Sequence, residues 1–188
     1  ERSRGLGDVY KRQKEWLSKY KKLREIIPYN SDNRRNIGFL WAAEKGADIL
    51  ITIDDDNFVR DSDFFGEHSI VGSLKTLPTV FSSTGWFNPL YLLKTNHGGM
   101  IYPRGYPFSK RTRDEKYVFK ETTGRVVINM GLWVNDPDVD AVTHLVYPTK
   151  ILALKKGYDH VMLASNVYSP INTQNTAFHR NILPCYYY

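Results

Sequence analysis

Three consecutive carboxylates, Asp54, Asp55 and Asp56, follow a run of apolar and β-branched residues at 49–53. An uninterrupted apolar run of that length predicts a fully buried strand of a parallel sheet. Charged side chains do not belong inside such a sheet, so we expect the aspartates just beyond the carboxyl end of the strand. In open α/β sheets, that is the edge where ligands bind.

The chemistry that these aspartates favour is the binding of a divalent cation. Crowded carboxylates repel one another, and a hard cation with oxygen ligands relieves that repulsion. The sequence therefore predicts a Mn²⁺ or Mg²⁺ site with Asp54 and Asp56 as the spaced ligands, while Asp55 orients the site or is a further ligand. Such a cation can hold a diphosphate and neutralise a phosphate leaving group. The alternative is a solvated acidic turn that caps the next helix.

Two arginines, Arg34 and Arg35, precede Asn36 at the start of a predicted helix that comes before the aspartates. Positive charges at the start of a helix oppose the helix dipole. A diphosphate or a base would offset this cost, because arginine binds phosphate through paired hydrogen bonds. We therefore predict that all three residues bind substrate, the alternative being a solvated pair of arginines.

Two later segments carry further candidates. Arg104 stands between a proline and a glycine beside aromatic residues, so it is either the anchor of a packed loop or a clamp for substrate. Trp133 can stack on a sugar or a base, and Asp136, Asp138 and Asp140 can bind hydroxyl groups. The alternative for the second segment is an acidic turn beside a core tryptophan.

Composition bounds the kind of protein. The chain has 188 residues, of which 41% are hydrophobic, enough for one globular domain with a core. Residues 1–13 look like the translated end of a sequencing adapter and are excluded from the fold. They hold four basic and two acidic residues, so the formal charge of +6 falls to +4 for the remainder. That balance suits phosphate ligands but gives no argument for nucleic acid.

Membrane spans and disulfides are not expected. No apolar run approaches the roughly 18–20 residues that a membrane span requires. Cys185 is the single cysteine, which excludes an intramolecular disulfide and suits a reducing compartment.

The remaining pattern predicts an α/β domain over residues 14–188 with a mostly parallel central sheet. Helices are predicted at 14–27, 33–45 and 61–77, with a short helix from 140 to 145 and a helical turn at 88–94. Strands are predicted at 49–53, 79–82, 125–129, 161–167 and 175–178, and a charged surface segment at 110–120.

Three stretches resemble a known family and occur in its order. They are Thr52-Ile-Asp-Asp-Asp-Asn-Phe-Val59, Arg104-Gly-Tyr-Pro-Phe-Ser109 and Gly131-Leu-Trp-Val-Asn-Asp-Pro-Asp-Val-Asp-Ala141. The chain resembles the reversibly glycosylated polypeptide family, which includes plant UDP-arabinopyranose mutases (glycosyltransferase family 75). The second stretch together with Gly-Leu-Trp is the most specific part of the resemblance.

The resemblance implies a GT-A fold, a Rossmann-like nucleotide-sugar domain, here incomplete at both ends. It implies Mn²⁺ or Mg²⁺ on the three aspartates and makes Arg104 the reversibly glycosylated residue, with Asp55 and Arg104 as the catalytic pair. Where the chain departs from the plant pattern, Asn172, Gln174 and Asn175 either read acceptor hydroxyls or are buried amides bonded to the backbone.

The resemblance leaves several functions open. A mutase re-attaches the sugar with altered ring size, whereas a glycosyltransferase passes it to an external glycan or protein acceptor. A third hypothesis is a non-catalytic subunit that binds nucleotide sugar or glycan, suggested by an exposed-looking aromatic connector at 81–91. The implied partner is a UDP-linked sugar, with a homo- or hetero-oligomer as a further possibility. The implied location is the cytoplasm, with peripheral Golgi association in a eukaryote.

Overall fold

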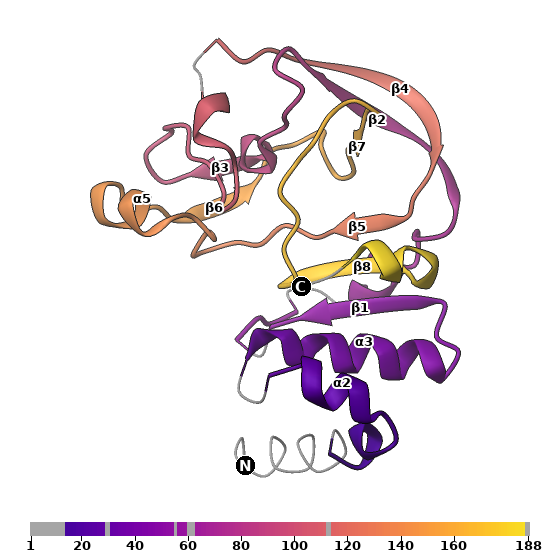
Figure 1. The fold of residues 1–188 in the computed structure, drawn as a ribbon. Coiled ribbons are helices and arrows are strands. Elements are labelled where there is room, and N and C mark those ends of the chain that lie inside the picture. Colours follow the sequence, from indigo (N-terminus) through magenta and orange to yellow (C-terminus); the bar gives the residue numbers. More distant parts are fainter. Residues whose placement is uncertain (1–13, 29–30, 55, 60–62, 112–113, 187–188) are drawn as a thin grey trace. The chain divides into compact units, whose positions relative to one another are not determined.

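The computed structural model describes residues 14–28, 31–54, 56–59, 63–111 and 114–186 (Figure 1). The chain forms two compact units, the first comprising Glu1–Ile51 and Ala177–Tyr188 and the second Thr52–Thr176. The division passes through two paired strands, so the single domain expected over 14–188 stays a prediction. The adapter-like segment 1–13 lies outside the described residues.

Unit 1 contains the predicted amino-terminal helices. Helix α2 (Lys21–Ile26) lies within the predicted helix at 14–27. A 3-10 turn, η1 (Asp32–Arg34), leads into α3 (Arg35–Glu44), which confirms the helix expected at 33–45. Gly46, with φ of +82°, follows α3 in the left-handed conformation that ends many helices. The apolar core here is formed by Trp16, Leu17, Ile27 and Ile37.

Strand β1 (Ile49–Ile53) has the bounds that the sequence predicts, but it is not fully buried. Burial alternates along it, and Ile53 is 49% exposed. The strand belongs to a three-stranded sheet with the order β1-β8-β5, where β8 is Asn175–His179 and β5 is Ile128–Met130. The prediction of a fully buried strand is therefore wrong, because only one face of β1 is covered.

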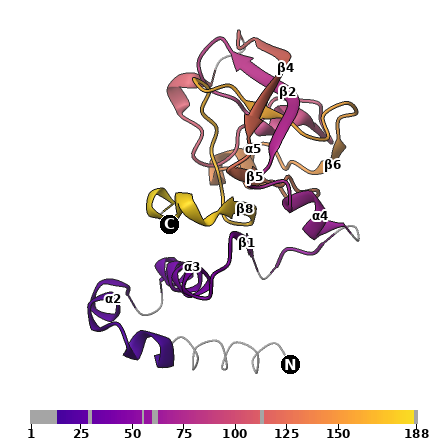
Figure 2. The ribbon, with the colours of Figure 1, turned by 90° about the vertical axis from the view of Figure 1, so that its right-hand side faces the viewer.

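Unit 2 is organised around a long two-stranded ribbon. Strand β2 (Leu74–Ser82) pairs antiparallel with β4 (Tyr117–Arg125) along its whole length, and both views show the two strands side by side (Figures 1 and 2). A two-residue strand, β7 (Met162–Leu163), pairs parallel with β2. Val80 of β2 is fully buried in a core cluster with Phe87 and Leu92.

The helix predicted at 61–77 is wrong over most of its length. Within the described part of that range, residues 63–77, helix is limited to α4 (Phe64–His68), and the chain is already extended from Leu74. Cross-strand hydroxyl pairs, including Thr76 with Thr123 at 2.7 Å, belong to the ribbon. Pairing with a distant strand thus overrides the local helical spacing of apolar residues.

A second antiparallel pair joins β3 (Leu93–Thr95) to β6 (Ile151–Leu154). The helical turn expected at 88–94 is a 3-10 turn, η2 (Pro89–Leu92), and the short helix expected from 140 is α5 (Ala141–Val146). Two further 3-10 turns are η3 (Phe108–Lys110) and η4 (Arg180–Cys185). Leu90 and Phe87 are each 3% exposed, so the connector at 81–91 is not the exposed aromatic surface that the sequence suggested.

The fold class is confirmed only in its coarser part. Helices and strands are mixed, as expected, but the strands pair mostly antiparallel. The predicted mostly parallel central sheet is not confirmed. In the described part of the chain, β2 pairs antiparallel with β4 and β3 with β6, whereas β2 pairs parallel with the two-residue β7. Apolar runs locate strands, but they do not fix strand direction. The strand expected at 125–129 is divided between β4 and β5, and β4 begins inside the expected surface segment at 110–120.

Candidate functional site

Arg104 sits at the tip of a tight turn in unit 2. The Tyr106 N–H donates to the Pro103 carbonyl at 3.1 Å, and Gly105 has a φ of +83°. A hydrogen-bonded turn of this kind requires a positive φ at its third position, which glycine adopts without strain. Pro103 and the aromatic ring of Tyr106 are buried, so the turn is anchored while the arginine at its tip is exposed.

The Arg104 side chain is bound by the carboxylate of Asp138. Its Nε donates to Oδ1 of Asp138 at 2.8 Å, and its Nη2 forms an ion pair with the same oxygen. The backbone N–H of Arg104 also donates to the Asp138 carbonyl at 2.9 Å. The arginine side chain is 69% exposed and the aspartate side chain only 14%. A mostly buried carboxylate therefore orients an arginine that remains open to solvent.

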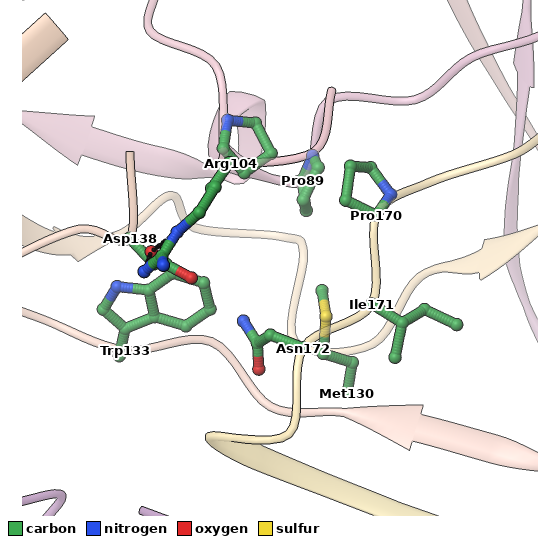
Figure 3. Close-up of a pocket in the computed structure, with 9 residues that line it drawn as sticks. Pro89, Arg104, Met130, Trp133, Asp138, Pro170, Ile171 and Asn172 are labelled. Carbon is green, nitrogen blue, oxygen red and sulfur yellow. Dashed lines mark hydrogen bonds and ion pairs between the residues drawn. The ribbon is translucent and has the colours of Figure 1, made fainter. Parts of the chain in front are cut away.

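Four residues predicted from the sequence line one cavity: Arg104, Trp133, Asp138 and Asn172 (Figure 3). We call this cavity the Arg104 pocket. In Figure 3 the Arg104 side chain reaches down to Asp138 beside the ring of Trp133, and Asn172 faces them from another loop. The other lining residues, which the sequence did not single out, are Pro89, Pro103, Met130, Pro170 and Ile171.

The Arg104 pocket is small in this conformation. It encloses about 20 Å³, which is room for about one water molecule. A sugar ring therefore needs a lining side chain to move.

Trp133 offers a hydrogen-bond donor as well as an aromatic face. Its Nε1 is buried, and no hydrogen-bond partner for it is found in the part of the chain that the structure describes. Buried donors of this kind are costly, and a ligand or a water molecule can satisfy them. The expected stacking role of Trp133 stays a prediction.

The aspartates on either side of Asp138 have other partners. Asp136 forms an ion pair with Lys150. Asp140 caps α5, because its Oδ1 accepts from the Thr143 N–H at 2.9 Å. This backbone hydrogen bond, helped by Arg111, lowers the pKa of Asp140. The alternative that the sequence left open, an acidic turn, thus holds for these two residues.

The candidate metal ligands also lie in unit 2, directly after β1. Asp54 is half-buried and Asp56 is exposed, whereas Asp55 lies outside the described residues. The Asp54 N–H donates to the Gln174 carbonyl at 3.2 Å. Within the described part of the chain, no group of three or more metal-ligating side chains is assembled. Two carboxylates remain a suitable oxygen donor set, because Mg²⁺ is commonly bound by one or two carboxylates with substrate phosphates and water.

The amino-terminal candidates belong to unit 1. Arg34 and Asn36 are each 8% exposed, and Arg35 is half-buried at the first turn of α3. Helix α3 has no acidic residue in its first turn, so the unfavourable charge that the sequence indicated is present. Because these residues and the aspartates lie in different units, their predicted joint action on a diphosphate stays a prediction.

The sequence of the reversibly glycosylated polypeptide family matches residues 7–188. That match covers nearly the whole chain, so the chain belongs to this family. Membership confirms the resemblance carried by the aspartate, Arg104 and Trp133 stretches. Among the described residues, no helix is long and apolar enough to cross a membrane.

Named relatives fall into two groups. Probable UDP-arabinopyranose mutase 4 of Arabidopsis thaliana is 33% identical over 165 residues, which cover 86% of this chain and 40% of that protein. UDP-arabinopyranose mutase 2 of the same plant is 30% identical, with 86% and 41% covered. Probable glycosyltransferase STELLO1, also of that plant, is 30% identical, with 81% and 21% covered. The chain thus spans well under half the length of these relatives.

Proposed function

We propose that this chain binds a UDP-linked sugar in unit 2 as part of an enzyme that isomerises or transfers the sugar. The observation that carries the proposal is the Arg104 pocket, where four separately predicted residues meet. Family membership supports the ligand class, because the relatives include UDP-arabinopyranose mutases and a probable glycosyltransferase.

Arg104 is proposed as the residue that accepts the sugar. A guanidinium nitrogen forms a bond to the anomeric carbon as the bond from that carbon to the diphosphate breaks, and UDP leaves with the bonding electrons. The nitrogen loses its proton to solvent. Asp138 supports this role because it holds Nε and Nη2 of Arg104 on one oxygen and so fixes the plane of the guanidinium group.

Asp54 and Asp56 are proposed to hold Mn²⁺ or Mg²⁺, and the proposal extends to Asp55. The cation would neutralise charge on the departing diphosphate. The GT-A fold is proposed on the same basis, because the aspartates directly follow β1. Arg34, Arg35 and Asn36 are proposed to add binding energy on the diphosphate or base.

The direct test is titration calorimetry of the purified chain with UDP, with and without Mn²⁺. We expect Mn²⁺-dependent binding that Asp54→Ala combined with Asp56→Ala abolishes. Glu121→Ala combined with Asp159→Ala is the matched control, because it removes two exposed carboxylates elsewhere in unit 2. Absence of Mn²⁺-dependent binding, or binding that the first double variant leaves intact, would rule out the proposed site.

A second candidate is transfer to an external glycan or protein acceptor, which the similarity to STELLO1 favours. Product analysis without acceptor separates the two, because only a mutase releases UDP-sugar with a changed ring size. Turnover of either kind would exclude a purely non-catalytic subunit. Oligomeric state and location in the cytoplasm or at the Golgi stay predictions.

A further inference from the structure

Residues 172–174, which we call the bridge segment, are fixed through their backbone carbonyls. Oγ1 of Thr176 donates to the Asn172 carbonyl at 2.7 Å, and Oγ1 of Thr52 donates to the Thr173 carbonyl at 3.0 Å. Both threonine donors are buried, with exposed fractions of 0% and 6%. Breaking either bond would leave a buried hydroxyl unsatisfied, so the bridge segment has little freedom to shift.

The last carbonyl of the bridge segment accepts hydrogen bonds from Asp54 and Asn57, the residues on either side of the candidate ligand Asp56. The Gln174 carbonyl accepts from the Asp54 N–H at 3.2 Å and from Nδ2 of Asn57 at 2.9 Å. The Asn57 N–H in turn donates to the Asp54 carbonyl at 3.2 Å. Asn57 therefore closes the turn with its backbone and fastens it to the bridge segment with its side chain.

The first residue of the bridge segment belongs to the Arg104 pocket. Asn172 lines that pocket, and its Oδ1 accepts from the Gln174 N–H at 3.1 Å. Gln174 therefore bonds in two directions: its N–H donates to Asn172, which lines the pocket, and its carbonyl accepts from the Asn57 side chain. All of these groups lie within unit 2.

We infer that Asn57 is a positioning residue that holds Asp54 and Asp56 in register with the Arg104 pocket through the Gln174 carbonyl. This inference rests on the proposed function. The distance between the diphosphate and the sugar of a nucleotide sugar is set by covalent bonds, so the groups that bind its two ends must keep a matching separation. The bridge segment is fixed in place and also contacts the Arg104 pocket. By bonding to this segment, Asn57 keeps the aspartates at a constant distance from the pocket.

The variant Asn57→Leu tests the inference, because leucine keeps the side-chain size and removes the donor. We expect Mn²⁺-dependent UDP binding to weaken roughly tenfold, the loss of about one hydrogen bond. Calorimetry gives the UDP affinity, and the signal of free Mn²⁺ in electron paramagnetic resonance gives the bound metal directly. The control is Asn96→Leu, since Asn96 is an equally exposed asparagine of unit 2 whose side chain also bonds to backbone, at Pro148 and Lys150.

Binding measured without the metal separates positioning of the aspartates from general support of the site. Because Asn57 is inferred to act through the aspartates that hold the metal, Asn57→Leu should leave the UDP affinity measured without Mn²⁺ unchanged. Thermal midpoints without ligand should match between Asn57→Leu and Asn96→Leu. Asn57→Ala serves as a second variant if the leucine lowers that midpoint.

Each outcome decides something. Wild-type chain without Mn²⁺-dependent UDP binding would overturn the proposed function and this inference together. Wild-type binding that Asn57→Leu and Asn57→Ala leave unchanged would overturn the inference alone. An equal loss of UDP affinity measured without Mn²⁺ would also overturn it, because Asn57 would then act independently of the metal and its carboxylates.

Discussion

Arg34 and Arg104 were both expected to contact substrate, yet the two side chains differ in exposure and in how they are held. Arg34 ends η1, occupies the position directly before α3 without a capping hydrogen bond from its side chain, and is 8% exposed. Arg104 stands on a turn with a side chain that is 69% exposed and is held by the mostly buried Asp138. The first arginine is enclosed by its unit, whereas the second is oriented at a surface. We therefore predict that Arg104, and not Arg34, is the reactive group.

The largest effect is expected from Arg104→Lys. Lysine keeps the positive charge but lacks the guanidinium nitrogens, so covalent labelling of the protein by radiolabelled UDP-sugar should be lost. Stability should change by less than about 0.5 kcal/mol, because the side chain is exposed. Labelling of the lysine variant at the wild-type level would remove Arg104 from its proposed role.

Arg34→Ala should show the opposite profile. Truncating a buried charged side chain leaves its surroundings unsatisfied, and a loss of roughly 1–3 kcal/mol in unfolding free energy is expected from chemical denaturation. Arg34 is also proposed to bind the diphosphate or base, so UDP affinity measured on the folded fraction should fall as well, but by less free energy than unfolding loses. Lys45→Ala, which removes an exposed cation at the other end of α3, is the control. A loss of UDP binding at unchanged stability would erase the contrast, because the main role of Arg34 would then be substrate binding, as proposed for Arg104.

Two glycines, one in each unit, allow the packing around the backbone of the two units to be compared. A Cβ at Gly131 would lie 2.1 Å from Nδ2 of Asn175, and that amide is held by a 2.8 Å bond to Nε2 of His68. Gly131→Ala should therefore destabilise the protein by about 1–3 kcal/mol. Gly38 lies within α3 and has open space around it, so Gly38→Ala should stabilise by up to about 1 kcal/mol. Thermal unfolding of the two variants checks both signs, and a harmless Gly131→Ala would contradict the packing described.

Asp138→Asn tests the orientation of Arg104 while keeping the shape of the side chain. Turnover or self-labelling should fall about tenfold, a loss near 1.4 kcal/mol, with a smaller change in KM. Stability should change by under about 1 kcal/mol, since one partner is exposed. Asp136→Asn is the control, because it breaks an ion pair two residues away whose members are both exposed. Equal effects of the two variants would show that Asp138 has no special role.

The smallest effect concerns Asp140 and depends on pH. The hydrogen bond from the Thr143 N–H lowers the pKa of this carboxyl below its ordinary value of 3.8. The stabilisation is therefore present above pH 3.8 and is lost as the pH falls through the lower pKa of the folded state. The gap in thermal midpoint between wild type and Asp140→Ala should be largest near pH 7 and shrink in acid. A gap that grows in acid would contradict the capping role.

The fold was predictable where structure is local. The α3 helix, β1 and the cap of α5 follow from apolar spacing, turn residues and Asp140, all within a few positions of one another. Within the helix predicted at 61–77, the extended part from Leu74 onward was not predictable, because β2 is specified by its distant partner β4. The mostly parallel strand direction was not confirmed, since direction also depends on distant partners.

The candidate site was predictable in its residue types but not in its assembly. Arg104, Trp133 and Asp138 follow from their motifs and line the same pocket. Nothing local in the sequence pairs Arg104 with Asp138, or joins Asn57 to the Gln174 carbonyl, since both contacts are long-range. The sequence did not indicate that the prolines line the pocket, because a proline predicts only an interruption of regular secondary structure.

The bond from Thr52 to the Thr173 carbonyl spans 121 positions of the chain. Closing so large a loop carries an entropic cost that must be met before the contacts on either side of it can form. Helices such as α3 need no such closure, so they can form early, whereas the aspartates and the Arg104 pocket acquire their shared reference late in folding. A chain in which the Thr52–Thr173 contact has not formed, or has broken, would therefore lack both the positioned aspartates and the Arg104 pocket.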